Sequence, residues 1–374
     1  MRRFPQILGI AIGLCAAVIV ISTISGKQNT TSSSAPVMSE CDGDLKELVI
    51  QYVRGAGAVL PVYHQFLPLL SSDVTVHAVC PELADFAELR QALPEISCKL
   101  DPILTHHEMT AWARDRWVAL PSSDQSEPTA LLAPRGESSA ASWPARAGDQ
   151  MVAFDITRAF PSKFAALRSG LNFDAGDFLS DGSTVFVTSS VLRRNLNQTV
   201  ASRDELVEIL HRELHAKIVL MDDSPDHHAA MFMTVSAGRT ILIADPKRAR
   251  ELLSSNSRIL GTLPGGADFS LETQRQLDAI ADQCRSLGYT VVRIPTLPAV
   301  DRKTYLTYVN VLSEARGDKK VVYMPIYRGA EALNDAAEKA WRGLGYEVHR
   351  IDCTSTYGLF GNLHCLVNVL HRSH

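Results

Sequence analysis

Neither sign of charge is in large excess in this sequence. Its 374 residues include 37 Lys and Arg against 41 Asp and Glu, which gives a formal net charge of −4, and no long run of like charge occurs. A dedicated nucleic-acid-binding protein needs a basic surface to displace counterions from phosphate, so no nucleic-acid partner is predicted. Hydrophobic residues make up 46% and charged residues 21%, which excludes wholesale disorder and indicates one large or two average globular domains.

Long apolar runs are also scarce. Only one is long enough to cross a bilayer, which excludes a transporter or channel with several spans. This run extends from Ile7 to about Ile24 and follows Arg2 and Arg3. Its roughly 18 residues lie near the minimum for a membrane-spanning helix, and the basic residues before it favour a cytoplasmic amino end. A cleaved signal peptide and an uncleaved signal anchor both remain open.

The amino-terminal run sets the expected domain organisation. Residues 1–25 are predicted to be a signal peptide or a membrane anchor. Residues 26–41 are rich in Ser, Thr, Asn and Gln, which predicts a flexible linker. Residues 42–374 are predicted to form the folded domain, membrane-anchored or secreted, on the extracytoplasmic side. Contact with the membrane is expected through the N-terminal segment only.

Cysteine is sparse, and the seven residues of this type are too few for a disulfide-held scaffold. An exported domain could pair Cys80 with Cys98, but the spacing does not determine connectivity. Residues 106–108 (HHE) match no helical zinc motif, so no metal site is predicted.

What the sequence does contain is a repeated unit of helix, glycine and strand. Residues 285–294 (RSLGYTVVRI) resemble residues 342–351 (RGLGYEVHRI), and in each copy a glycine separates an amphipathic helix from a strand. Hairpin signals recur at 178–187, 231–243 and 309–323, which favours mixed sheets over a purely parallel sheet. Such units bury their apolar faces by packing around a common axis, so a ring of α/β modules is predicted, with a doubly wound sheet as the competing fold.

Chemically active side chains gather just before the strands of these units. They lie in residues 112–117 (WARDRW), 173–178 (FDAGDF), 226–232 (DHHAAMF) and 361–369 (GNLHCLVNV), the last of which is predicted to place a thiol in the final strand. Four such loops at one end of a ring would bring carboxylates, an imidazole and a thiol into one pocket.

The order and spacing of these motifs resemble the guanidine-modifying (pentein) superfamily, in particular agmatine deiminase and bacterial peptidylarginine deiminase. The matching segments are 112–115 (WARD), 174–177 (DAGD), 228–232 (HAAMF) and 361–365 (GNLHC). The resemblance covers most of residues 42–374. It implies an α/β fold, a pentein-type five-bladed α/β propeller of ββαβ modules with pseudo-fivefold symmetry, which agrees with the repeats.

The resemblance implies cysteine-dependent, hydrolytic deimination of a guanidino substrate to a ureido product and ammonia. The partner would be a small molecule such as agmatine or arginine, or the arginine side chain of a peptide. In this chemistry a carboxylate holds the planar guanidinium while a thiolate attacks its carbon and forms a covalent thiouronium. A histidine protonates the departing ammonia and then activates the hydrolytic water. No cofactor or metal is implied.

Mapped onto this chain, the resemblance makes Cys365 the nucleophile and His228 the general acid and base. Asp174 would orient His228, and Asp115 would bind the guanidinium. The other substrate-binding positions would be Asp177, Trp112 and Asn362. Without the resemblance each position has a plainer interpretation, since Cys365 could be an inert buried thiol and Asp115 could form a structural ion pair.

One position departs from the family pattern. Ala230 stands where the family has a second guanidinium-binding aspartate, and counting from His227 instead of His228 does not restore an acid there. Losing one of two buried charged partners costs roughly 2–5 kcal/mol in binding. Other acids of the same loop could reach in: Asp222, Asp223 or Asp226. The alternatives are therefore a catalytically impaired pentein that acts as a membrane-tethered binding module, or amidinotransferase or dihydrolase chemistry on the same scaffold.

Overall fold

The computed structural model describes residues 36–122, 126–136, 144–254 and 257–373, which lie in one compact unit, Ser33–His374. The predicted signal peptide or anchor (1–25) and most of the predicted linker lie outside the described residues. Within the described ranges, no helix has the length and apolar character needed to cross a membrane.

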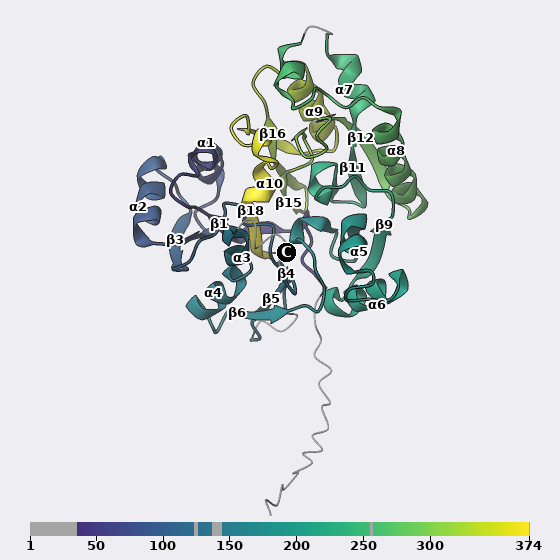
Figure 1. Ribbon diagram of the computed structural model, residues 1–374. Coiled ribbons are helices and arrows are strands. Elements are labelled where there is room, and N and C mark those ends of the chain that lie inside the picture. The colour runs from purple at the N-terminus through teal and green to yellow at the C-terminus, as the bar shows by residue number, and fades with distance from the viewer. Residues whose placement is uncertain (1–35, 123–125, 137–143, 255–256, 374) are drawn as a thin grey trace, which may run out of the picture. The chain divides into compact units, whose positions relative to one another are not determined.

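Five sheets repeat one strand pattern, in which an antiparallel pair is extended by a parallel strand, and the first sheet adds a second parallel strand (Figure 1). The first sheet has the order β18-β1-β2-β3, formed by Val367–Ser373, Asp44–Gln51, Thr75–Cys80 and Lys99–Leu104. The second and third are β4-β5-β6 (Val118–Leu120, Thr129–Ala133, Phe164–Arg168) and β7-β8-β9 (Phe178–Ser180, Thr184–Thr188, Lys217–Met221). The fourth and fifth are β10-β11-β12 (Met233–Ser236, Thr240–Asp245, Thr290–Pro295) and β15-β16-β17 (Leu312–Arg316, Lys319–Ile326, Glu347–Asp352). A short pair, β13 (Leu297–Pro298) and β14 (Tyr305–Leu306), forms a sixth sheet.

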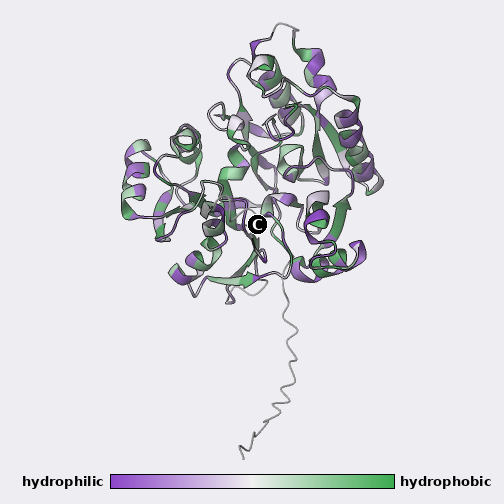
Figure 2. Cartoon of the chain, viewed as in Figure 1, coloured by the Kyte–Doolittle hydropathy of each residue, from purple (hydrophilic) through white to green (hydrophobic). Residues whose placement is uncertain are grey.

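Helices connect the parallel strands of each module, as parallel pairing requires. In the first two sheets they are α1 (Leu60–Phe66), α2 (Leu83–Ala92), α3 (Pro144–Asp149) and α4 (Val152–Ala159). In the other sheets they are α5 (Ser189–Asn195), α6 (Arg203–Leu214), α7 (Pro246–Leu252), α8 (Leu271–Ser286) and α9 (Glu331–Gly343). Figure 2 shows many hydrophilic residues on α6 and α8, whereas the strands are mainly hydrophobic.

The internal repeat is confirmed as two equivalent helix-to-strand connections, α8 to β12 and α9 to β17. Gly288 and Gly345 follow the helices with φ of +83° and +84°, the left-handed conformation that glycine adopts without a Cβ penalty. The predicted apolar face of α8 is buried at Leu277, Ile280, Ala281 and Cys284. The predicted α/β class is therefore confirmed, and the competing doubly wound sheet is wrong because the strands form separate small sheets.

The packed structure begins before the predicted boundary at Asp42. Val37 and Cys41 are buried, and the backbone N–H of Val37 donates to the carbonyl of Leu214 in α6 at 3.0 Å. Residues 37–41 therefore belong to the packed domain rather than to a linker, because their apolar side chains are covered by the core.

The cysteines of the described residues are all buried free thiols: Cys41, Cys80, Cys98, Cys284, Cys353 and Cys365. The disulfide considered between Cys80 and Cys98 is therefore not formed. Burial raises the pKa of Cys80 to about 12, which makes this thiol unreactive at neutral pH.

Candidate active site

Four segments that each precede the first strand of a module carry the predicted site residues. Asp115 lies in the turn before β4, and Asp174 caps the short 3₁₀ helix η3 (Ala175–Asp177) before β7. His228 caps the 3₁₀ helix η4 (Ala229–Met231) before β10. Cys365 lies in α10 (Leu363–Leu366), directly before β18. The expectation that Cys365 sits in the last strand is therefore wrong by two residues, because that strand begins at Val367.

Cys365 is almost fully buried, with 5% of its surface exposed, and its sulfur has two polar neighbours. The side-chain amide of Asn310 donates to Sγ at 3.3 Å, and His228 lies close enough to the same thiol for the two groups to interact. Met231 and Tyr305 pack against it within a small apolar cluster. The thiol is thus in contact with an imidazole and an amide rather than surrounded by hydrocarbon alone.

Asn310 was missed by the sequence analysis, although it also holds the helix that carries the thiol. Its Oδ1 accepts the backbone N–H of His364 at 2.9 Å and that of Cys365 at 3.4 Å. The amide of Asn310 therefore caps the amino end of α10 while its nitrogen contacts the sulfur. Its only signal in the sequence was its place in the hairpin segment 309–323.

His228 lies between two carboxylates. Its Nδ1 is 3.6 Å from Oδ1 of Asp115, and its Nε2 is 3.4 Å from Oδ2 of Asp174. Burial opposes a charge on the imidazole, but Asp115 and the hydrogen bonds to Asp174 and Cys365 outweigh it and raise the pKa of His228 well above its usual value. His228 is therefore an imidazolium at neutral pH and can donate a proton.

The absence of a side chain at Gly176 allows His228 to lie close to η3, because a Cβ on Gly176 would be 2.5 Å from Nδ1 of His228. The neighbouring His227 is placed differently: its Nε2 contacts the backbone carbonyl of Lys303 at 2.9 Å. Burial and the nearby His228 lower the pKa of His227 to about 4. The geometry thus favours His228 over His227 for acid–base chemistry.

Asp174 and Asp177 form a reciprocal cap across η3 and share one arginine. Asp174 donates its backbone N–H to Oδ2 of Asp177 at 2.9 Å, and Arg194 pairs with both carboxylates. Arg116 pairs with Oδ1 of Asp174 at 2.6 Å. Burial would raise the pKa of Asp174, but Arg116, His228 and Arg194 outweigh it and hold the pKa well below its usual value. Asp174 is therefore ionised, and Asp177 braces the turn that presents it.

The carboxylate of Asp115 is already paired with a guanidinium group of the same chain. Arg146 in α3 donates from one terminal nitrogen to Oδ2 of Asp115 at 2.7 Å and lies 3.4 Å from Oδ2 of Asp149. Its other terminal nitrogen is 3.5 Å from Oδ1 of Asp174. Nothing in the sequence marked Arg146, because an isolated arginine in a short helix has no motif.

Ala230 is buried, and its carbonyl accepts from the Asn310 amide at 3.4 Å. The three acids considered as substitutes for the missing aspartate are all exposed, and two of them pair with surface arginines: Asp222 with Arg203 and Asp226 with Arg193. The possibility that Asp222, Asp223 or Asp226 replaces the missing aspartate is therefore not supported, because all three side chains face solvent.

Asn362 and Trp112 lie beside the segment that carries Cys365. Asn362 is fully buried at the start of α10, and neither polar atom of its side chain has a hydrogen-bond partner within the described residues. Trp112 packs against the Cys365 cluster, and a Cβ on Gly361 would lie 2.5 Å from its ring. No group of three or more His, Cys, Asp or Glu side chains in the described ranges could hold a metal ion.

Comparisons with known proteins identify the fold. No family model matches the chain, and no curated protein matches it. Among solved structures, the agmatine deiminase of C. jejuni matches with a TM-score of 0.65 and 14% identity over 91% of this chain and 97% of that chain. The agmatine deiminase of Enterococcus faecalis matches with a TM-score of 0.65 and 14% identity over 91% and 96%. A structure provisionally assigned as a peptidyl-arginine deiminase matches with a TM-score of 0.67 and 14% identity over 91% and 100%. The chain therefore shares the fold of these deiminases, as the resemblance implied.

Proposed function

Because the chain has the pentein-superfamily fold, we propose that it is a cysteine hydrolase that converts a guanidino group into a ureido group with release of ammonia. The observation that carries this proposal is the contact of Cys365 with His228, which itself lies between Asp115 and Asp174. A thiol, a protonated imidazole and two ionisable acids are the groups that this chemistry needs. In support, an agmatine deiminase variant from C. jejuni with serine in place of a cysteine binds its substrate.

The proposed reaction proceeds through one covalent intermediate. The Cys365 thiolate attacks the guanidinium carbon, and a C–S bond forms as the C–N bond to the leaving nitrogen breaks. His228 gives its proton to that nitrogen, which departs as ammonia. The neutral imidazole then takes one proton from water as the water attacks the thiouronium carbon. The C–S bond breaks and restores the Cys365 thiolate, the second proton passes to solvent, and the neutral ureido product leaves.

Asp115 is proposed to bind the substrate guanidinium. Asp174 is proposed to orient His228, the role that the resemblance gives it, and also to contact the guanidinium. Arg146 supports this role, because its own guanidinium already bridges these two carboxylates in the structure. A substrate would have to take the place of Arg146, since Asp115 cannot offer the same oxygen to two guanidinium groups. Asn362, with its unpaired polar atoms, is proposed to contact the substrate beside Cys365.

The arrangement of the modules and the cellular location of the protein are part of the same proposal. The five modules are proposed to close into a five-bladed propeller around the four loops. Residues 1–25 are proposed to export or anchor the chain, so that the substrate is extracytoplasmic agmatine, arginine or a peptidyl arginine. A reporter enzyme fused after His374 would be active only on the outer side of the membrane, and activity confined to the cytoplasm would refute this location.

The test is a ureido assay on the purified full-length protein with agmatine, arginine and an arginine-containing peptide. We expect product from at least one substrate, none from Cys365→Ala, and wild-type product from the control Cys284→Ala, which removes a buried thiol of α8. Absence of product from every substrate, or equal product from Cys365→Ala, would refute the proposal.

A second candidate is a binding module without turnover. Two observations favour it: Ala230 replaces an expected aspartate, and Arg146 fills the guanidinium position. In that case a guanidino ligand would bind, as measured by calorimetry, while no ureido product would form. Identification of the product would also separate deimination from amidino transfer.

A further inference from the structure

The segment 37–43, here called the strap, is hydrogen-bonded to four of the five modules of the domain. Its backbone N–H groups donate to carbonyls in β4, β7 and β15, from Met38 to Ala119, from Glu40 to Ser180 and from Gly43 to Ala315. The β18 strand reaches it through Arg372, which donates to the carbonyl of Glu40 at 2.9 Å. Cys41 packs in the apolar cluster that contains β10 and β11. Residues 37–41, which were expected to belong to the linker, thus join modules that are far apart in the sequence.

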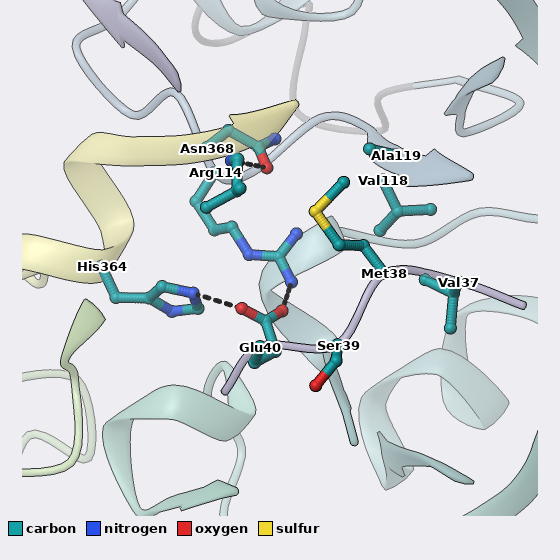
Figure 3. Close-up of a pocket in the computed structure, with 10 residues that line it drawn as sticks. Val37, Met38, Ser39, Glu40, Arg114, Val118, Ala119, His364 and Asn368 are labelled. Atoms are coloured by element: carbon teal, nitrogen blue, oxygen red, sulfur yellow. Dashed lines mark hydrogen bonds and ion pairs between the residues drawn. The ribbon is translucent and has the colours of Figure 1, made fainter. Parts of the chain in front are cut away.

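The side chain of Glu40 joins two of the loops that carry the site (Figure 3). One carboxylate oxygen accepts from a terminal nitrogen of Arg114 at 2.5 Å, and the other contacts Nε2 of His364 at 3.1 Å. Arg114 directly precedes Asp115, and His364 directly precedes Cys365. The same two loops meet again where the backbone N–H of Arg114 donates to the carbonyl of Cys365 at 3.2 Å.

The carboxylate of Glu40 is held in its charged form. Burial would raise its pKa, but Arg114, His364 and Arg372 outweigh burial and lower the pKa to about 2. Burial likewise lowers the pKa of His364, so this imidazole is neutral at pH 7 and donates its Nε2–H to Glu40. Both bonds are therefore charge-assisted, which makes them shorter and stronger than neutral hydrogen bonds.

The hollow beside this cluster is too small for a substrate. It measures about 20 Å³ and is lined by Met38, Glu40, Arg114, His364 and Asn368 among others, which is room for about one water molecule. Glu40 therefore does not contact a guanidino ligand. Any effect that it has on catalysis must act through Arg114 and His364.

We propose that Glu40 is a positioning residue, which holds the Cys365 helix in register with the Asp115 turn and so makes the amino-terminal strap part of the catalytic apparatus. This inference rests on the proposed function, because the register matters only if Cys365 and Asp115 act on the same substrate. It also predicts an effect on the thiol itself, which can be measured without any substrate.

The test compares Glu40→Gln with Asp42→Asn in the full-length protein. Asp42 is a matched control, because it carries the same charge on the same strap but its side chain bonds to Ser39 and not to the catalytic loops. For Glu40→Gln we expect kcat to fall by roughly tenfold to 100-fold with little change in KM, as expected from a small displacement of reacting groups. For Asp42→Asn we expect wild-type kcat.

A second measurement separates this inference from the proposed function. The rate at which iodoacetamide alkylates Cys365, followed by peptide mass spectrometry, should change severalfold in Glu40→Gln and stay unchanged in Asp42→Asn. If the wild type forms no ureido product, the proposed function fails, while the alkylation rates still test the positioning role. Equal alkylation rates in the wild type and both variants would overturn it.

If Glu40→Gln does not fold, the same measurements are made on Glu40→Asp. The shorter carboxylate keeps its charge but can reach only one of its two partners. We expect an intermediate alkylation rate and an intermediate kcat. Wild-type values for both would overturn the positioning role.

Discussion

Removal of the Glu40 charge should make the free energy of unfolding of the domain depend less on pH below pH 7. Arg114, His364 and Arg372 lower the pKa of Glu40 from 4.5 to about 2 against the cost of burial. A depressed carboxyl pKa contributes stability that is present above the unfolded pKa and is lost as pH falls toward the folded pKa. The shift of about 2.5 units corresponds to about 3 kcal/mol at pH 7, at 1.36 kcal/mol per unit. We therefore expect Glu40→Gln to be about 3 kcal/mol less stable than the wild type at pH 7.

The stability difference between the wild type and Glu40→Gln should shrink as the pH falls, by an amount set by the unfolded and folded pKa values of Glu40. Protonation of Glu40 in the unfolded chain removes about 1 kcal/mol of the wild-type advantage by pH 4 and about 2 kcal/mol by pH 3. The assay is urea unfolding followed by tryptophan fluorescence, at several pH values between 7 and 3. The control Asp318→Asn removes an exposed carboxylate and should change stability little at any pH. A Glu40→Gln difference that stays constant from pH 7 to pH 3 would refute the electrostatic account of this cluster.

Two further substitutions test the site. We expect Arg146→Gln to lower the KM for a guanidino substrate by roughly tenfold or more, equivalent to about 1.4 kcal/mol, because Asp115 no longer holds an internal guanidinium; an equal or higher KM would show that Arg146 does not compete. We expect Gly176→Ala to lower kcat by roughly 100-fold, because the new Cβ would lie 2.5 Å from Nδ1 of His228. Gly343→Ala, where a Cβ meets nothing within 4 Å, should keep wild-type activity, and equal kcat values for the two alanine variants would contradict this geometry.

The parts of the site that could be predicted from the sequence are those with a local signature. Asp115 and Cys365 stand in short motifs next to strands, so their segments could be identified one by one. Arg146, Glu40 and Asn310 have no such signature, because their roles come from partners that are distant in the chain. Arg146 lies 31 residues from Asp115, Asn310 lies 55 residues from Cys365, and Glu40 lies 324 residues from His364. Only the folded arrangement makes them neighbours.

The same distinction applies to the fold. The repeated helix, glycine and strand of residues 285–294 and 342–351 predicted two modules correctly, since hydrophobic periodicity and the left-handed glycine are local properties. The strap could not be recognised, because its Ser- and Thr-rich surroundings are typical of a linker. Its order comes from backbone bonds to separate modules rather than from its own composition.

The pairing of β18 with β1 links the completion of the first sheet to the segment that carries the proposed nucleophile. The first sheet remains without one edge until the last residues of the chain are available, since Val369 pairs with Leu48 and Val367 with Ile50. The segment that completes this edge follows Cys365 directly. A chain that stops before Cys365 therefore lacks both the proposed nucleophile and the strand that completes the first sheet, whereas a chain that stops within β18 keeps the thiol but leaves the edge of that sheet unfinished.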